Sequence, residues 1–231
     1  MLSFRDVRVV RGDRTVLRVD SLDLPPGLSV LAGPNGAGKS TLLLAVAGLV
    51  DLEGGTVSLD GAVLHDGTAP APLAGRRRTA LLFQEPYLMS GTVRAAVEIG
   101  LKLRKVPAVE RRQRVQRVLE RLDISHLAGK RTTKLSGGER RKVALAQALV
   151  LDTEVLLLDE VTVNLDEESV HTVIDLLKKR VEDGRRVVLL ATHDAHLATM
   201  LHASVYRVDK GRMVPQPCEQ VRGEAVKQER A

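Results

Sequence analysis

A glycine-rich stretch near the N-terminus has the residue types and spacing of a phosphate-binding loop. Residues 33–41 read Gly-Pro-Asn-Gly-Ala-Gly-Lys-Ser-Thr and match the pattern G-x-x-x-x-G-K-[ST]. A random chain of this length would match the pattern by chance in about 1% of cases. The stretch also lies between an apolar run and a helical pattern, which further disfavours a chance match. We expect Lys39 to reach the β- and γ-phosphates of ATP and Ser40 to ligate Mg²⁺. The loop residues expected to bind ATP are Asn35, Gly36, Ala37, Gly38, Lys39, Ser40 and Thr41.

Two carboxylates that follow an apolar run are the next candidates. Residues 155–158 are all apolar, which predicts a buried strand, and Asp159 and Glu160 come directly after them. The strand end would place Asp159 beside the phosphate loop, where its carboxylate can hold Mg²⁺. Glu160 would point elsewhere and can orient and deprotonate a water that attacks the γ-phosphate. The alternative, a strand that exits to solvent through acidic residues, would be favoured without the phosphate loop.

A third candidate is the sequence Leu-Ser-Gly-Gly-Glu at residues 135–139, which precedes a helical pattern. Ser136 and Glu139 have the spacing of a capping box at a helix start. Two glycines in a first helical turn cost roughly 1 kcal/mol each, and capping alone does not require them. Bare amides aimed at a phosphate do require them. Both roles are compatible.

The elements that must position these residues alternate between strands and helices. Strands are predicted at 2–10, 16–24, 28–32, 56–59, 79–83, 155–158, 187–191 and 205–208. Helices are predicted at 39–48, around 170–177 and, in several pieces, over 92–149. This alternation indicates an α/β fold with a mainly parallel sheet, into which the helical middle is inserted. The arginine run at 76–78 is expected to form a loop or a strand edge.

Composition limits the classes of protein to which the chain can belong. Its 231 residues are 44% apolar, as in globular domains, and 2% aromatic, which argues against a stacking platform for single-stranded nucleic acid. The net charge of +6 is compatible with phosphate ligands, nucleic acid or an anionic membrane surface, and it does not discriminate among them. Cys218 is the only cysteine, so no disulfide framework is expected. We predict neither a secretory signal nor a membrane span, because no apolar run approaches about 18–20 residues.

The chain resembles the nucleotide-binding subunits of ABC transporters over residues 2–214, most specifically in the Leu-Ser-Gly-Gly-Glu stretch, which resembles the ABC signature. The resemblance implies a P-loop NTPase (RecA-like) core, an N-terminal antiparallel β subdomain and an inserted α-helical subdomain. It implies one domain at 1–217, with core parts 1–84 and 150–217 and a helical part at about 85–149, then a polar tail at 218–231. It also implies a dimer in which Ser136, Gly137 and Gly138 bind in trans the ATP held by the opposite subunit.

The resemblance gives roles to further residues and agrees with those already expected for Lys39 and Glu160. Lys39, Glu160 and His193 would be catalytic, with His193 after the strand 187–191 resembling the switch histidine that contacts the γ-phosphate. Gln84 resembles the Q-loop glutamine that touches Mg²⁺. The alternative interpretation is a glutamine at a strand end that simply faces solvent. Asp166 resembles the D-loop residue at the dimer interface, and an N-cap role is compatible with that.

Two positions depart from the family pattern. Arg11 stands where an aromatic side chain usually stacks on adenine, and a guanidinium can stack on a purine. Val161 follows Glu160 where a proline is usual, which removes no reacting group. We therefore expect a competent ATP site.

The resemblance also implies the partner proteins and the cellular location. These are a second ABC ATPase in a homodimer or heterodimer, a separate transmembrane permease and a substrate-binding protein, at the cytoplasmic face of the cell membrane. The absence of fused membrane helices favours an importer, and residues 83–88 resemble those of oxyanion importers for tungstate, molybdate or phosphate. The alternative is a soluble ABC ATPase acting on DNA or the ribosome. It is disfavoured because the chain has one copy of the motifs and no long coiled coil, so no nucleic acid is expected.

Overall fold

The computed structural model describes residues 1–68 and 71–216, so the expected tail at 218–231 lies outside the described residues. The strands are β1 (Leu2–Arg11), β2 (Arg14–Leu24), β3 (Gly27–Ala32), β4 (Gly54–Leu59), β5 (Ala62–His65), β6 (Thr79–Leu82), β7 (Val155–Asp159), β8 (Val187–Ala191), β9 (Ser204–Asp209) and β10 (Arg212–Gln216). The helices are α1 (Lys39–Val46), α2 (Leu73–Arg77), α3 (Val93–Leu103), α4 (Ala108–Arg121), α5 (Gly137–Leu149), α6 (Glu167–Val181) and α7 (Ala195–Leu201). All eight predicted strands are confirmed, with ends shifted by two residues or fewer.

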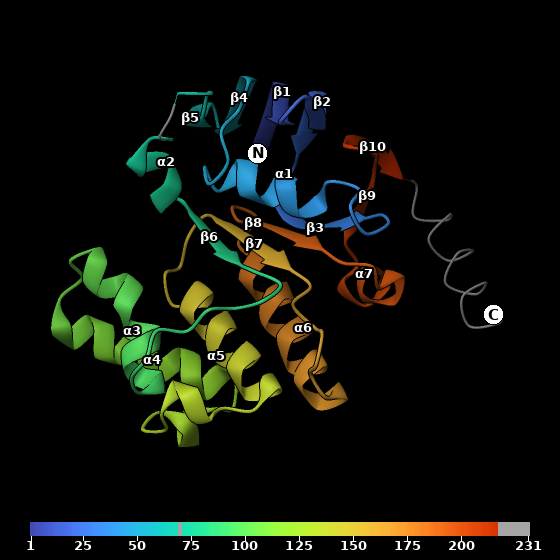
Figure 1. Ribbon diagram of the computed structural model, residues 1–231. Coiled ribbons are helices and arrows are strands. Elements are labelled where there is room, and N and C mark those ends of the chain that lie inside the picture. Colours follow the sequence, from blue (N-terminus) through green and yellow to red (C-terminus); the bar gives the residue numbers. More distant parts are fainter. Residues whose placement is uncertain (69–70, 217–231) are drawn as a thin grey trace.

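The strands form one mixed sheet in the order β5-β4-β1-β2-β10-β9-β3-β8-β7-β6. The part β9-β3-β8-β7-β6 is parallel, whereas β5, β4, β1 and β2 pair antiparallel. The sheet curls, so that β1, β2 and β4 lie above α1 while the parallel strands lie below it (Figure 1). The predicted α/β class is confirmed.

Two hydrophobic cores lie on the two faces of the parallel strands. Successive residues of β7 alternate between the cores, since Leu156 and Leu158 pack with α3 to α7 whereas Val155 and Leu157 pack with α1 and the antiparallel strands. Every residue of β7 and β8 is buried, which explains their continuous apolar sequence. Because both faces are covered, the loops at the carboxyl ends of these strands remain as the place for a ligand.

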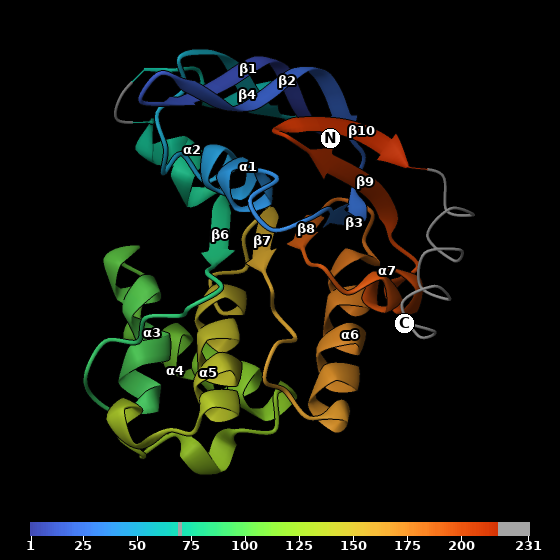
Figure 2. The same cartoon turned by 45° about the vertical axis from the view of Figure 1, so that its right-hand side comes forward.

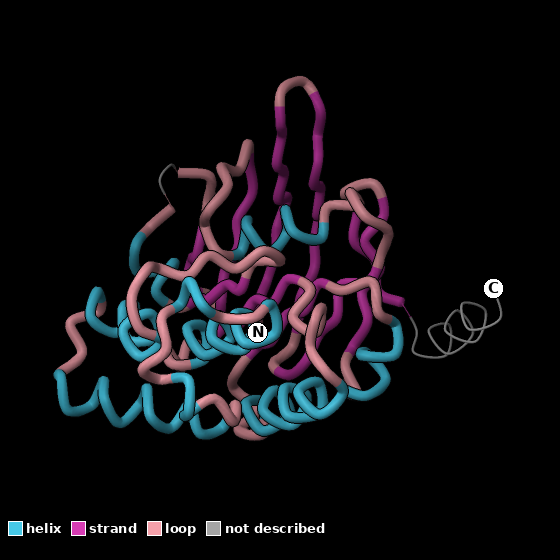
Figure 3. The backbone as a smooth tube through the Cα atoms, turned by 60° about the horizontal axis from the view of Figure 1, so that its bottom comes forward, coloured by secondary structure: helices cyan, strands magenta, loops and turns pink. Residues whose placement is uncertain are grey.

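The helical middle packs as a group beneath the parallel strands, with α3 and α4 beside α5 (Figure 2). The β1–β2 hairpin, by contrast, projects from the body of the molecule (Figure 3). The division into core and helical subdomain at given boundaries stays a prediction.

Three local expectations were wrong or incomplete. Arg76 and Arg77 lie in the short helix α2, which follows Pro72 as N-cap, and not in a loop or strand edge. The first helix ends at Val46, and Gly48 lies beyond it at φ +65°, in the left-handed region that favours glycine. The elements α2, β5 and β10 were not predicted, because each has only four or five residues and no clear period.

Candidate nucleotide site

The glycine-rich loop connects β3 to α1, as the phosphate-binding role requires. Gly33 has φ +152°, and a Cβ there would lie 2.2 Å from the carbonyl oxygen of Val208. Gly38, the residue that precedes α1, has φ +110°, and a Cβ there would lie 3.1 Å from the carbonyl oxygen of Val16. Both positions therefore need glycine for the loop to take this path. The loop leads directly into the first turn of α1, whose amides have no partner within the helix and are free to bind an anion.

Lys39 is buried, and its ammonium lies over this loop. Its Nζ donates to the carbonyl oxygens of Gly33 at 2.6 Å and Pro34 at 3.1 Å. The loop is also tied to the turn before β10, because the amide of Gly211 donates to the carbonyl of Ala37 at 2.8 Å. A cation is thus held at the N-terminus of α1, where partial positive charge already favours an anion. Asn35, Gly36 and Ser40 of the same loop are exposed, and Thr41 is partly buried.

Asp159 ends β7 beside the first turn of α1. Burial raises the pKa of its carboxyl group, and a hydrogen bond with Ser40 partly offsets that rise. The structure thus brings Ser40 and Asp159 together. A hydroxyl and a carboxylate are oxygen ligands of the type that bind Mg²⁺ together with nucleotide phosphates. A cation here would also relieve the cost of burying the charge.

Glu160 is 5% exposed and is held from several sides. Its backbone is left-handed at φ +51°, which costs a residue with a Cβ roughly 1 kcal/mol. Its amide donates to Ala191 at 2.9 Å, and its Oε2 accepts from Thr192 Oγ1 at 3.2 Å. Its Oε1 lies 2.8 Å from Nδ1 of His193, whose side chain is 65% exposed. Glu160 and His193, two of the three residues predicted to be catalytic, are therefore in direct contact, one buried and one open to solvent.

Gln84 lies just after β6, exposed at the same edge of the sheet. Its main-chain carbonyl accepts a hydrogen bond from Nη2 of Arg141 at 2.8 Å, and Nη1 of the same guanidinium donates to the carbonyl of Glu160 at 2.7 Å. Arg141 and Thr192 are site residues that the sequence reasoning missed. Nothing in the local pattern marks them, because their partners lie far away in the chain.

Residues 135–139, the signature segment, begin α5 as predicted. Ser136 is the N-cap and forms a full capping box with Glu139, with contacts of 3.2 and 2.7 Å. A Cβ on Gly137 would meet no atom within 4 Å, and its φ is not positive, so the fold does not need a glycine there. The packing of the single chain therefore does not account for this glycine.

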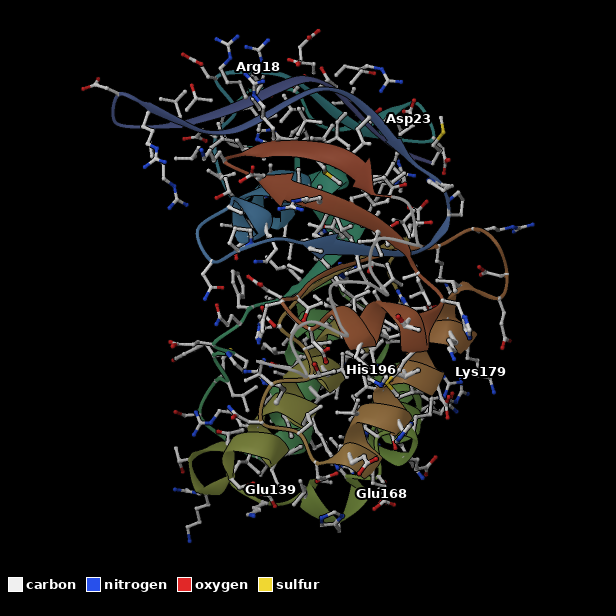
Figure 4. The ribbon with its side chains drawn as sticks, turned by 90° about the vertical axis from the view of Figure 1, so that its right-hand side faces the viewer. Arg18, Asp23, Glu139, Glu168, Lys179 and His196 are labelled. Carbon is white, nitrogen blue, oxygen red and sulfur yellow. The ribbon has the colours of Figure 1, made fainter. Side chains whose placement is uncertain are left out.

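The signature segment and the phosphate loop lie at different ends of the molecule. Figure 4 places Glu139 at the bottom, with α5, whereas α1 lies above the parallel strands. Glu168, in the first turn of α6, lies at the same end as Glu139 (Figure 4). Within one chain, the signature segment and the loop at α1 therefore lie apart.

Asp166 is the N-cap of α6. Its Oδ1 accepts from the amide and hydroxyl of Ser169 at 2.8 and 2.6 Å, and these bonds lower the pKa of Asp166. The N-cap role is therefore present, and an interface role stays a prediction. The preceding loop touches the signature segment, because a Cβ on Gly138 would lie 3.1 Å from the carbonyl oxygen of Asn164.

Arg11 ends β1, opposite Arg14 on β2. Both side chains are exposed near the tip of the projecting hairpin. The structure leaves Arg11 open to solvent, and its stacking on adenine stays a prediction.

The fold and this site define a P-loop protein that binds a nucleoside triphosphate. A model of the ABC transporter family matches residues 17–163. The chain belongs to the ABC transporter family and is an ATP-binding, ATP-hydrolysing domain of it.

Individual relatives are import proteins with different cargoes. The mycobactin import ATP-binding/permease protein IrtB of Mycolicibacterium thermoresistibile is 39% identical over 92% of this chain and 37% of that protein. The methionine import protein MetN of Caulobacter vibrioides is 36% identical over 93% and 66%. The tungstate uptake protein TupC of Peptoclostridium acidaminophilum is 33% identical over 87% and 91%. The chain thus spans less than two thirds of the first two proteins.

Solved structures agree over nearly the whole chain. CbiO1 of Clostridium perfringens, part of an ABC transporter complex, has a TM-score of 0.83 and 28% identity over 99% of this chain and 93% of that one. A dimeric post-hydrolysis state of the ATP-binding cassette MJ0796, bound to ADP and Pi, has a TM-score of 0.81 and 25% identity over 93% and 98%. No helix within residues 1–68 and 71–216 is long and apolar enough to cross a membrane.

Proposed function

We propose that the chain is the ATPase subunit of a membrane importer, in which two subunits close around ATP and drive a separate permease. The main observation is the separation of two half-sites. Lys39, Asp159, Glu160 and His193 gather at the phosphate loop, whereas Glu139 of the signature segment lies apart from it, at the bottom of the molecule in Figure 4. A second copy, or a close relative, placed head to tail would bring the two halves together. The dimeric MJ0796 structure supports this arrangement.

Each residue of the site then has a task. Lys39 and the amides of residues 35–41 hold the phosphates, while Ser40 and Asp159, with Gln84 alongside, would hold Mg²⁺, which neutralises charge on the phosphates. Glu160 accepts the proton of the attacking water, since its carboxylate is fixed by Thr192 and His193. His193, exposed at the sheet edge, contacts the γ-phosphate.

The partner subunit supplies the rest. Ser136, Gly137 and Gly138 present the free amides of α5 to the γ-phosphate across the interface, and Asp166 lies beside them there. Closure therefore depends on ATP, and loss of the γ-phosphate reopens the dimer.

A groove beside Gln84 fits a cytoplasmic segment of the permease. It has a volume of about 370 Å³, and its apolar lining includes Leu81, Phe83, Tyr87, Ile99 and Leu151. Phe83 is 47% and Tyr87 83% exposed, so two aromatic side chains of this groove are open to solvent in the isolated chain. Since the groove adjoins Gln84 and α5, dimer closure would move the elements that line it.

We also propose that the complex imports a small oxyanion, with a substrate-binding protein as a further component, at the cytoplasmic face of the cell membrane. The tungstate protein TupC supports this cargo, since the alignment spans 91% of its length. The permease and the binding protein would select the cargo, so uptake of labelled tungstate, molybdate and phosphate by cells with and without this chain is the deciding assay.

The docking proposal is tested by purification from detergent-solubilised membranes of cells that express the tagged chain. We expect a polypeptide with several membrane spans to co-purify, and Tyr87→Ser to reduce its yield while ATP hydrolysis by the isolated chain is unchanged. Val109→Ser, at another exposed apolar side chain on α4, is the matched control. Co-purification of DNA or ribosomes in place of a membrane protein would support the soluble alternative.

Arg11→Ala is expected to weaken ATP binding by about 3- to 5-fold, the effect of removing one cation–π contact at an exposed site. Equilibrium binding of ATP and of a base-free triphosphate measures it, and only ATP should lose affinity. Arg14→Ala, directly opposite on the hairpin, is the control. Unchanged ATP affinity in Arg11→Ala would remove Arg11 from the site.

A further inference from the structure

Arg141 lies on α5, five residues after Ser136, and the roles described above leave it without a task. It is 6% exposed. Among residues 1–68 and 71–216, its guanidinium donates to two main-chain carbonyls and to no carboxylate. One carbonyl belongs to Gln84, in the loop just after β6, and the other to Glu160, directly after β7.

A buried guanidinium without an ion pair is costly, and neutral side chains can bridge a helix to a sheet at lower cost. Burial lowers the pKa of Arg141, and the nearby charges of Glu160 and Asp159 oppose that change. The forked geometry of arginine explains its use here, because its two nitrogens reach two carbonyls at once.

One of these carbonyls belongs to the residue with the strained backbone. Glu160 has φ +51°, and such a conformation persists only where its surroundings hold it. Ala191 holds its amide and Arg141 holds its carbonyl, so the two together fix the direction in which the side chain leaves the backbone. A displacement of about 1 Å at such a group can cost on the order of 100-fold in rate.

We propose that Arg141 is a positioning residue for hydrolysis, whose guanidinium fixes the main chain at Gln84 and Glu160 to the signature helix so that the Glu160 carboxylate is aimed at the attacking water. The inference rests on the proposed role of Glu160 as the base. Because the first turn of the same helix is proposed to bind the partner's ATP, Arg141 also connects that contact to the base of its own subunit.

The first experiment compares Arg141→Met, Arg141→Lys and the exposed-site control Arg117→Met on α4. We expect Arg141→Met to lower kcat by about 10- to 100-fold while the equilibrium Kd for ATP changes by less than about 3-fold. Arg141→Lys should recover part of the rate, since lysine keeps the charge and donors but not the fork. Parallel losses of ATP affinity and Tm, with no recovery in Arg141→Lys, would show a merely structural role.

The second experiment repeats Arg141→Met in a Glu160→Gln background under single-turnover conditions. If Arg141 acts through Glu160, the added substitution should change the residual rate by less than about 2-fold. The same fold-loss in both backgrounds would overturn the inference while leaving Glu160 as the base. Failure of the unsubstituted protein to hydrolyse ATP would instead overturn the proposed function, so the two failures are distinguishable.

Discussion

Glu160→Gln is expected to lower kcat for ATP hydrolysis by at least about 100-fold, because a general base contributes 10²–10⁴-fold and the amide cannot accept the proton. Glutamine keeps the shape of the side chain and can still accept a hydrogen bond from Thr192. ATP binding should therefore persist, and a dimer with trapped ATP should accumulate. Size-exclusion chromatography with saturating Mg-ATP, alongside a phosphate-release assay, measures both effects.

Asp194→Asn is the matched control for this substitution. Asp194 is a nearby carboxylate that caps α7 and has no proposed part in catalysis. We expect it to keep hydrolysis within about 3-fold of the original rate, since asparagine caps a helix about as well as aspartate. If Glu160→Gln stays monomeric with ATP and hydrolyses at the normal rate, the base is a different group.

Gly137→Leu is expected to abolish multiple-turnover hydrolysis while the fold stays intact. A Cβ at Gly137 meets no atom within 4 Å in the single chain, and leucine gains about 0.8–1 kcal/mol of helix propensity over glycine. The free energy of unfolding should therefore stay the same or rise. The side chain would instead fill the space in which the partner's γ-phosphate has to lie. ATP affinity of the isolated chain should be unchanged.

Gly129→Leu is the control, because a Cβ on Gly129 would also meet no atom within 4 Å and its φ is not positive. It should leave both hydrolysis and stability within the range of ordinary surface substitutions, about 0.5 kcal/mol. Full activity in Gly137→Leu would mean that the glycine serves no ligand, whatever the shape of the dimer.

The parts of the site that the sequence predicted are those carried by contiguous residues. The phosphate loop, Asp159 and Glu160, and the capping box at Ser136 each combine a local pattern with a local physical reason. The strands β3, β6, β7 and β8 were predictable for the same reason, since buried parallel strands are continuous apolar runs.

The parts that escaped prediction depend on contacts between distant segments. Arg141 donates to a carbonyl 57 residues away, and any residue type can offer that carbonyl, so the sequence holds no trace of the pair. Thr192 meets Glu160 from the next strand of the sheet, 32 residues on, and looks like an ordinary strand end. β10 pairs with β9 through main-chain bonds, which again leave no side-chain pattern.

The most direct test of the two-half-site dimer mixes two variants, Lys39→Ala and Gly137→Leu, each expected to be inactive alone. A mixed dimer contains one site built from an unaltered phosphate loop and an unaltered signature segment. With random pairing, half of the dimers are mixed and each has one working site of two, so about a quarter of the original ATPase activity should return on mixing. If the mixture stays as inactive as its components although mixed dimers form, or if Gly137→Leu alone is fully active, the proposed sharing of one site between two chains is wrong.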